Sequence, residues 1–294
     1  MPAARTRRTV DGATHHVARL RGVDLHHVRA GATGSPVLLV HGFPETWWAF
    51  HRVLPALARH HRVHAVDLRG FGDSGPADDH QDAAAAAEDL HALVEHLGLG
   101  PVHLLAQDVS GGAAVRLAAT HPGDVRSLVA VETGLPGYGL EALADVTRGG
   151  AWHVGVLAAP GVPEMLLPGH ERAFLRALLT AATTVPGAVT ETDLDELART
   201  YARPGGWSGA AALYRSLLTE GAALRALLTR APLRVPVLAV GGSGGAFTVD
   251  TLRQVAAGHV VDVRLDGVGH HVALEAPERL AAAVLAHTAR VDAA

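Results

Sequence analysis

This chain of 294 residues contains no cysteine. It therefore has neither a disulfide framework nor a zinc site built from thiolates. A chain of this length buries a core large enough to be stable without such cross-links. We expect one large domain, or a core domain that carries an insertion. The absence of cysteine does not indicate whether the protein works in a reducing or an oxidising compartment.

The sequence also lacks long hydrophobic runs. No stretch of eighteen apolar residues occurs, which argues against a membrane-spanning helix. The first residues carry Arg5, Arg7 and Arg8 but lead into His15 and His16 rather than into an apolar segment. They do not resemble a secretory signal, so we expect a cytoplasmic protein with no membrane partner.

Basic charge is not in excess either. The chain has 25 Lys and Arg against 29 Asp and Glu, a net charge of −4, and only 4% of its residues are aromatic. No basic stripe interleaved with aromatics is present, so nucleic acid is not an expected partner. Six of the 20 histidines fall in three polar pairs, at 15–16, 26–27 and 60–61, which we interpret as solvated surface, and we expect one or two histidines to be chemical.

What the chain does contain is a regular alternation of short apolar runs and helical segments. Such runs are typical of strands buried on both faces, and the alternation predicts a mostly parallel α/β sheet. Residues 15–29 alternate polar and apolar side chains and predict a hairpin at the sheet edge. The other expected strands are 36–40, 61–66, 101–106, 125–131, 235–240 and 259–265, and the expected helices are 46–60, 82–97, 111–121, 249–257 and 276–290.

The alternation stops at Thr133 and resumes after about residue 230. The stretch between offers helical segments separated by Gly/Pro loops and no credible strand. We predict a core domain formed by residues 1–133 and 231–294, with an all-helical cap inserted at 134–230. The helices expected in the insertion are 141–147, 170–182, 191–202 and 208–229.

An acid stands where one of the buried strands gives way to a helix. Asp108 ends the run that begins at residue 101, and small residues flank it at Ala106 and Ser110. This spacing suits a tight elbow that presents a nucleophile. Asp is also a favoured helix N-cap, and the stretch alone does not separate the two interpretations. Ligands bind beyond the carboxyl ends of parallel strands, so the other strand ends matter too.

The motifs at these ends resemble the α/β-hydrolase fold family, within it the branch of epoxide hydrolases and dehalogenases that uses an Asp nucleophile. The resemblance covers about residues 15–290 and implies an eight-stranded, mostly parallel sheet with a helical cap. Its carriers are HGFPETWWAF at 41–50, DLRGFGDSG at 67–75, AQDVSGG at 106–112, GGAWHVGVLAAPGVPEML at 149–166, LYR at 213–215 and GVGHHVALEAPE at 267–278.

The resemblance implies that Asp108 attacks carbon to form an ester and that a histidine activates the water that hydrolyses it. His270 fits this base best, with His271 as the second choice. No carboxylate follows strand 235–240, where many members carry the acid that orients the histidine, and Asp250 is better explained as a helix cap. We therefore assign that acid to Glu132. The glycine run 241–245 lacks the spacing of a nucleotide-binding loop.

The resemblance also implies two oxyanion donors and a proton donor. The backbone N–H groups of Phe43 and Val109 are the expected oxyanion donors, and His41 is expected to support the first of these loops. Tyr214 matches the second of the two tyrosines with which relatives protonate an opened epoxide. His153 stands where the first tyrosine is expected, and we predict that it shares this task.

These assignments favour epoxide hydrolysis, with no cofactor and no metal. Val109 and Phe43 stand where dehalogenases carry halide-holding Trp or Asn, and no arginine stands at 109 or 112. The alternatives are a haloalkane or haloacid dehalogenase, and a catalytically silent scaffold that binds a ligand.

We expect a small apolar substrate bearing an epoxide. The predicted substrate contacts are Trp152, Phe43, Val109 and Trp207. A homodimer is compatible with the sequence. The Ala/Gly/Arg/Val-rich composition resembles that of high-GC bacterial proteins, in which such enzymes often serve secondary metabolism.

Overall fold

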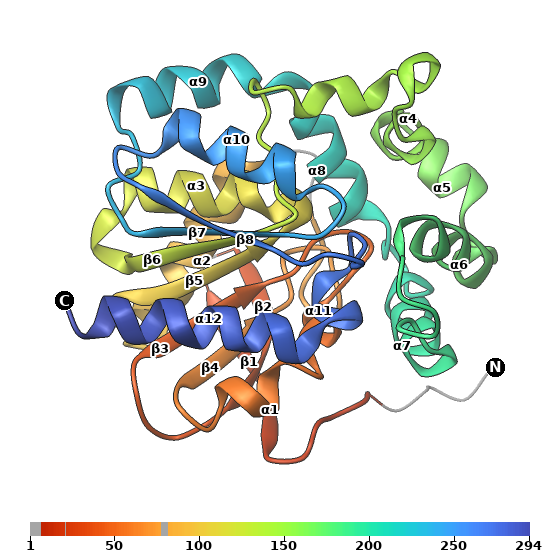
Figure 1. Ribbon diagram of the computed structural model, residues 1–294. Coiled ribbons are helices and arrows are strands. Elements are labelled where there is room, and N and C mark those ends of the chain that lie inside the picture. Colours follow the sequence, from red (N-terminus) through yellow and green to blue (C-terminus); the bar gives the residue numbers. More distant parts are fainter. Residues whose placement is uncertain (1–6, 21, 78–81) are drawn as a thin grey trace.

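An eight-stranded sheet forms the centre of the protein (Figure 1). The computed structural model describes residues 7–20, 22–77 and 82–294, so Arg5 of the N-terminal segment lies outside the described residues. The strand order is β1-β2-β4-β3-β5-β6-β7-β8. The strands are β1 (Ala13–Leu20), β2 (Val23–Ala30), β3 (Pro36–Val40), β4 (Arg62–Val66), β5 (Val102–Gln107), β6 (Val125–Val131), β7 (Val237–Gly241) and β8 (Val260–Arg264).

The sheet is parallel from β4 to β8, and only the pairings of β2 with β1 and with β4 are antiparallel. The predicted mostly parallel sheet and its edge hairpin are thus confirmed. Because β3, β5, β6 and β7 run the same way, their carboxyl ends meet at one edge of the sheet. That edge holds the ends of the strands that the sequence singled out.

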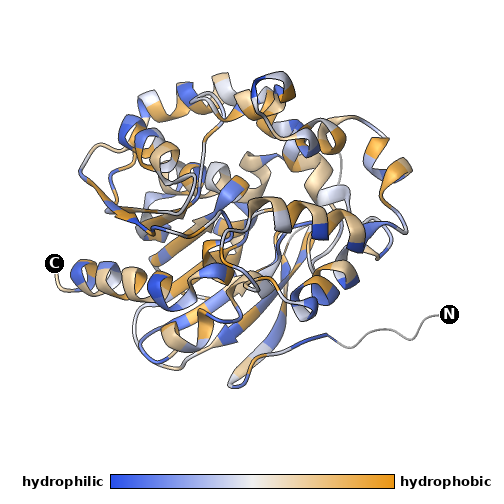
Figure 2. Ribbon diagram, turned by 45° about the vertical axis from the view of Figure 1, so that its right-hand side comes forward, coloured by the Kyte–Doolittle hydropathy of each residue, from blue (hydrophilic) through white to orange (hydrophobic). Residues whose placement is uncertain are grey.

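Helices cover both faces of the sheet and bury two separate apolar clusters. Leu38 and Val40 of β3 belong to one cluster, and Val37 and Leu39 belong to the other, so β3 is buried on both sides. Figure 2 shows hydrophobic colouring concentrated in the central strands. One face packs against α2 (Ala83–His96), α3 (Gly111–Thr120) and α10 (Gly245–Val255), and the other against α1 (Leu54–Leu57), α11 (Val272–Glu275) and α12 (Pro277–Asp292) (Figure 1).

The segment between β6 and β7 contains helices and no strand among its residues, all of which the structure describes. Figure 1 shows α4 to α7 beside one end of the sheet. No helix in the described part of the chain is long and apolar enough to cross a membrane. The helices of this segment are η4 (Leu140–Ala144), η5 (Val146–Arg148), α4 (Trp152–Ala158), α5 (Val162–Leu166), α6 (Glu171–Ala182), α7 (Glu191–Tyr201), α8 (Ser208–Thr219) and α9 (Gly221–Arg230).

Several predicted helices differ from the structure in extent, and the segment 141–147 is two short 3₁₀-helices, η4 and η5. The segment 46–60 contains only a short 3₁₀-helix, η1 (Trp47–Phe50), and α1. All four residues of η1 are buried, so this part of the segment has no exposed side, unlike a surface helix that buries only one face. The segment 208–229 is two helices that part at Gly221. A Cβ atom at Gly221 would lie 2.7 Å from the backbone nitrogen of Gly137, so the two backbones approach closely at this break.

The helix predicted at 249–257 begins four residues earlier, at Gly245. Asp250 is therefore inside the helix and not its cap, and its carboxylate lies 3.6 Å from Arg253 on the exposed surface. Two further helices, α4 and α5, were not predicted, because each spans only two turns or fewer and offers too little periodicity.

Candidate active site

Asp108 stands on a sharp turn between β5 and α3. Its φ of 55° lies in the left-handed region, which is uncommon for a residue other than glycine and costs backbone energy. The turn needs a close neighbour without a side chain, since a Cβ atom at Gly42 would lie 2.5 Å from Cβ of Asp108. The buried Ser110 hydroxyl donates to the carbonyl of Gln107 at 2.7 Å, which supports the turn from within. Asp108 is thus presented by an elbow.

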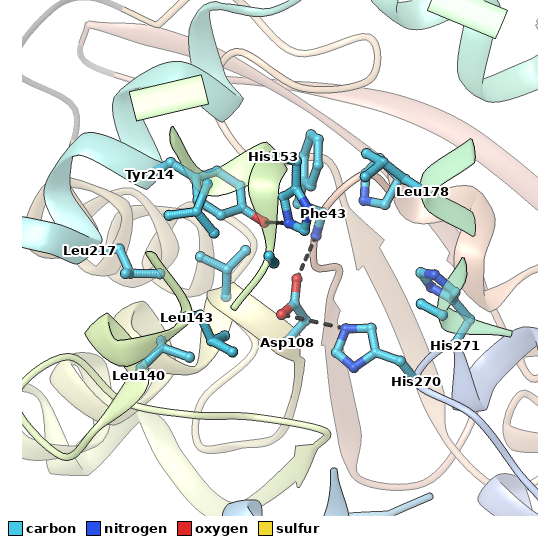
Figure 3. A pocket seen from close by; sticks show the side chains of 15 residues that line it. Phe43, Asp108, Leu140, Leu143, His153, Leu178, Tyr214, Leu217, His270 and His271 are labelled. Atoms are coloured by element: carbon cyan, nitrogen blue, oxygen red, sulfur yellow. Dashed lines mark hydrogen bonds and ion pairs between the residues drawn. The ribbon is translucent and has the colours of Figure 1, made fainter. Parts of the chain in front are cut away.

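His270 links the two predicted acids. Its Nε2 lies 3.5 Å from Oδ1 of Asp108 (Figure 3). Its Nδ1 lies 3.2 Å from Oε2 of Glu132. The residues come from three different places, the end of β5, the end of β6 and the loop after β8. The structure therefore brings Asp108, His270 and Glu132 together as the sequence predicts.

The glycine run after β7 holds Glu132 in place. The N–H of Gly242 donates to Oε1 of Glu132 at 2.7 Å, and the N–H of Gly244 donates to Oε2 at 2.9 Å. Glu132 has a φ of 50°, the second left-handed residue at the site. A Cβ atom at Gly244 would lie 2.6 Å from Oε2 of Glu132, so this position needs glycine. Sequence reasoning missed this cradle, although a glycine run where the acid was absent offered a signal.

The charges of this set are strongly coupled. Burial alone would lower the pKa of His270, but hydrogen bonds and attraction to Asp108 and Glu132 raise that pKa well above its usual value. Burial would raise the pKa of Asp108, but the hydrogen bond with His270 and its charge lower it. The resting site is therefore an ion pair, with an ionised carboxylate and a protonated imidazole.

Two backbone N–H groups face the Asp108 carboxyl group. The N–H of Phe43 donates to Oδ2 at 3.0 Å, and hydrogen bonds from the N–H groups of Phe43 and Val109 both help to lower the pKa of Asp108. The loop that presents Phe43 is held by His41, whose Nε2 accepts from the N–H of Leu68 at 3.1 Å. Negative charge on this carboxyl group is stabilised from two directions.

A cavity of about 220 Å³ opens onto Asp108 and His270 (Figure 3). Phe43 and Val109 line it, as predicted. Its wall is mostly apolar, and the aliphatic residues with the longest side chains there are Leu140, Leu143, Leu178 and Leu217.

Trp152 and Trp207, the other two predicted substrate contacts, do not line this cavity. The Trp152 side chain is half exposed and meets the edge of Phe174. Trp207 is buried against Tyr201 with ring centroids 4.3 Å apart. Both indoles belong to the packing within the helical segment.

Tyr214 and His153 lie together across the cavity from His270. The Tyr214 hydroxyl is 3.3 Å from Nε2 of His153 (Figure 3). Burial, with a contribution from the Asp108 charge, raises the pKa of Tyr214 well above its usual value. Burial lowers the pKa of His153. At neutral pH the pair is therefore uncharged, with a phenolic proton available.

His271 points away from the Asp108 carboxylate into a buried polar network. Its Nδ1 lies 3.1 Å from Oε1 of Glu45, and the Gln107 amide donates to the same carboxylate at 2.8 and 3.0 Å. The structure thus favours His270 over His271 as the partner of Asp108.

A further buried carboxylate, missed in the sequence, brackets the His270 loop. Glu275 accepts backbone hydrogen bonds from Gly269 at 2.9 Å and His271 at 3.1 Å, on either side of His270. It also accepts from Thr184 and Val185 in the helical segment, at 2.7 and 2.8 Å. Glu275 therefore joins the loop that carries His270 to the helical segment.

Two clusters of histidines and acids in the described part of the chain have ligand atoms close enough together to share a metal ion. Neither cluster contains a residue that lines the cavity.

The family described as "alpha/beta hydrolase fold" matches residues 35–277. The soluble epoxide hydrolase of Corynebacterium sp. (strain C12) is 30% identical over 277 residues, which are 90% of this chain and 93% of that protein. The fluoroacetate dehalogenase of Burkholderia sp. is 31% identical over 195 residues, 63% of this chain and 64% of that protein.

Solved structures agree with the observed architecture. The crystal structure of wild-type Cfl2 from Burkholderia cenocepacia matches with a TM-score of 0.87 and 32% sequence identity. The match covers 95% of this chain and 98% of that one. The similarity thus includes both the sheet and the helical segment.

Proposed function

This chain belongs to the α/β-hydrolase fold family, and we propose that it is an epoxide hydrolase that converts an oxirane to a vicinal diol through an ester on Asp108. The similarity to the soluble epoxide hydrolase of Corynebacterium supports the reaction class. The observation that carries the proposal is the uncharged Tyr214–His153 pair, which faces the Asp108–His270 ion pair across one apolar cavity.

In the first step the Asp108 carboxylate attacks an epoxide carbon. The C–O bond breaks, its electron pair stays on oxygen, and the Tyr214 hydroxyl gives that oxygen its proton. Nε2 of His153 lies within reach of the same hydroxyl and holds it in position. A carboxylate is already ionised at neutral pH, so this attack needs no base.

In the second step protonated His270 first gives its proton through solvent to the Tyr214 phenolate. The neutral imidazole then takes a proton from water, and the hydroxide adds to the carboxyl carbon of the ester. The N–H groups of Phe43 and Val109 stabilise the oxyanion that forms. Collapse releases the second diol oxygen as an alkoxide, which takes its proton from the Asp108 carboxyl group. This restores the resting ion pair of ionised Asp108 and protonated His270, and Glu132 stabilises the imidazolium.

We propose that the helical segment, residues 134–230, is a cap over a core formed by residues 1–133 and 231–294. The cap supplies Tyr214, His153 and much of the apolar cavity wall, whereas the core supplies the charged groups. A small apolar substrate fits this arrangement, because its reacting atoms would meet the Asp108 carboxylate where the cap adjoins the core.

Isotope labelling tests the covalent route. In a single turnover in H₂¹⁸O, with enzyme in excess, the diol should form without ¹⁸O because its new oxygen comes from Asp108. Repeated turnovers should then yield labelled diol. Labelled diol in the first turnover would show direct attack by water, and no diol from any of a broad panel of epoxides would refute the activity.

Substitutions at the proton donors test the ring-opening step. Tyr214→Phe should slow ester formation by about 10²–10⁴-fold, the usual contribution of a general acid. His153→Ala should slow it less, because the phenol remains. Leu217→Ala, on the same cavity wall, is the control for altered packing. Unchanged ring opening in both donor variants would refute their role.

Dehalogenation is the second candidate, because the Burkholderia dehalogenase is similar over part of the chain. No Arg or Lys lines the described cavity, so a haloacid carboxylate has no cation to meet there. Halide release from haloalkanes or haloacids at rates comparable with diol formation would favour this candidate. A silent scaffold would instead bind epoxides without forming either product.

A further inference from the structure

A cluster of histidines and carboxylates lies on the surface of α2, apart from the catalytic cavity. Its core is His91, His121 and Asp124, whose possible ligand atoms all lie within 4.8 Å of one another. His91 belongs to α2, whereas His121 and Asp124 belong to the turn between α3 and β6. His91 precedes His121 and Asp124 by about thirty residues, so it meets them only in the fold.

We propose that His91, His121 and Asp124 form a binding site for a divalent transition-metal ion of the Zn²⁺, Ni²⁺ or Cu²⁺ class. Imidazole nitrogen combined with carboxylate oxygen is the donor set that these ions prefer. Mg²⁺ and Ca²⁺ favour oxygen ligands alone and fit it poorly.

The two imidazoles are already side by side. Their ring centroids are 3.8 Å apart, and the ring planes differ by 14°. Nδ1 of His91 lies 2.5 Å from Oδ2 of Asp124, so two of the three ligand atoms already adjoin. Because the stacked rings direct their lone pairs in parallel, one ring must turn to coordinate the same ion. The side chain of His121 is partly exposed, which leaves it room for this turn.

Two further carboxylates surround the histidines. Oε1 of Glu88 lies 3.1 Å from Nε2 of His121, and Oε2 of Glu95 lies 3.6 Å from Nε2 of His91. Glu88, His91 and Glu95 share one face of α2, because residues three and four apart on a helix are neighbours. The hydrogen bond with Asp124, and the charges of Asp124, Glu95 and Glu88, raise the pKa of His91. The local field therefore favours a cation.

The site is remote from catalysis. Asp124 comes just before β6, whereas Glu132 comes just after it, so the two acids lie at opposite ends of a seven-residue strand. A strand of that length spans about 23 Å. A bound ion would join α2 to the turn before β6 and stabilise the fold without touching the reacting groups.

The test is isothermal titration calorimetry of the 294-residue chain with Zn²⁺ alone, in a buffer that does not chelate metal. We expect one ion to bind per chain, and the melting temperature to rise when Zn²⁺ is added. His121→Ala and Asp124→Asn should each weaken binding at least tenfold and abolish the rise. His259→Ala, which removes an exposed histidine elsewhere, should change neither.

Copper gives an independent readout. The electron paramagnetic resonance spectrum of bound Cu²⁺ should show coupling to two imidazole nitrogens in the natural chain, and to one in the His121→Ala variant. Equal affinity for Zn²⁺ in the natural chain and in a folded His91→Ala/His121→Ala variant would overturn the proposal. In that case the cluster is a network of ion pairs only.

Discussion

At the scale of single residues, the proposed mechanism depends on the charge of His270. Asp108 and Glu132 together hold the pKa of this imidazole well above its usual value, against the effect of burial. Esterification would remove the charge of Asp108 and leave Glu132 as the one carboxylate in contact. The pKa of His270 should therefore fall once the ester forms, which would turn a protonated imidazole into a base when a base is needed.

This change predicts that the two chemical steps differ in pH dependence. Ester formation uses the ionised Asp108 and the protonated Tyr214, whose pKa values are lowered and raised respectively, so its rate should vary little between about pH 8 and about pH 6. Ester hydrolysis needs neutral His270 and should fall about tenfold per unit below its pKa in the ester. Rapid-quench measurements separate the steps, and a parallel fall of both rates would contradict the account.

At the scale of elements, the loop between β7 and α10 is where sequence and structure differ most usefully. The run Gly241–Gly245 was notable for the acid that it lacks, and in the structure it binds the acid that β6 supplies. The position of Glu132 followed from the resemblance and from the cost of burying an acid at a strand end. The backbone cradle did not, because which N–H groups point at a carboxylate depends on tertiary packing.

Gly244→Ala should therefore displace Glu132. The added Cβ atom would lie 2.6 Å from Oε2, and His270 would lose an aligned partner. We expect kcat to fall by about 10²-fold or more, since misplacement of an orienting acid costs that much in comparable sites. Gly258→Ala is the matched control, because nothing lies within 4 Å of a Cβ atom there. Equal steady-state rates for the two variants would refute the cradle's role.

At the scale of the whole molecule, the sheet and its two helical layers could be predicted, because short apolar runs are typical of strands that are buried on both faces of a sheet. The helical segment was less predictable. The lengths of its helices depend on close backbone contacts such as that between Gly137 and Gly221. Trp152 and Trp207 contact other aromatic side chains of the helical segment, because an aromatic side chain fits a core as well as a substrate wall.

The burial of several histidines was not predicted, because pairs such as His26 and His27 were interpreted as solvated surface. His27, His64 and His287 are all buried. Burial, with repulsion from neighbouring cationic groups, lowers the pKa of His27 to about 3 and the pKa values of His64 and His287 to about 4. These histidines are neutral in the folded chain at neutral pH.

Their lowered pKa values predict acid sensitivity of the whole fold. In the unfolded chain these side chains bind protons near the ordinary histidine pKa of 6.5, whereas the folded chain binds them only near pH 4. The free energy of unfolding is therefore not reduced by these histidines above pH 6.5, and it decreases as the pH falls from 6.5 toward 4. Each buried histidine should cost roughly 1.4 kcal/mol per pH unit in the free energy of unfolding.

Urea denaturation at several pH values measures this loss. His287→Leu should reduce the pH slope by one proton, because neither ring nitrogen of His287 has a hydrogen-bond partner among the described residues. The exposed His259→Gln should leave the slope unchanged. An unchanged slope in His287→Leu would contradict the assignment of this histidine.

The most direct test of the central claim is the mass of the intact protein after a His270→Gln variant is mixed with an epoxide. Without its base the variant should still form the ester but not hydrolyse it. We predict a mass increase equal to one epoxide, located on Asp108 by peptide mapping and absent from the His270→Gln/Asp108→Asn variant. No adduct with epoxides that the natural chain hydrolyses, or an adduct on another residue, would contradict the account.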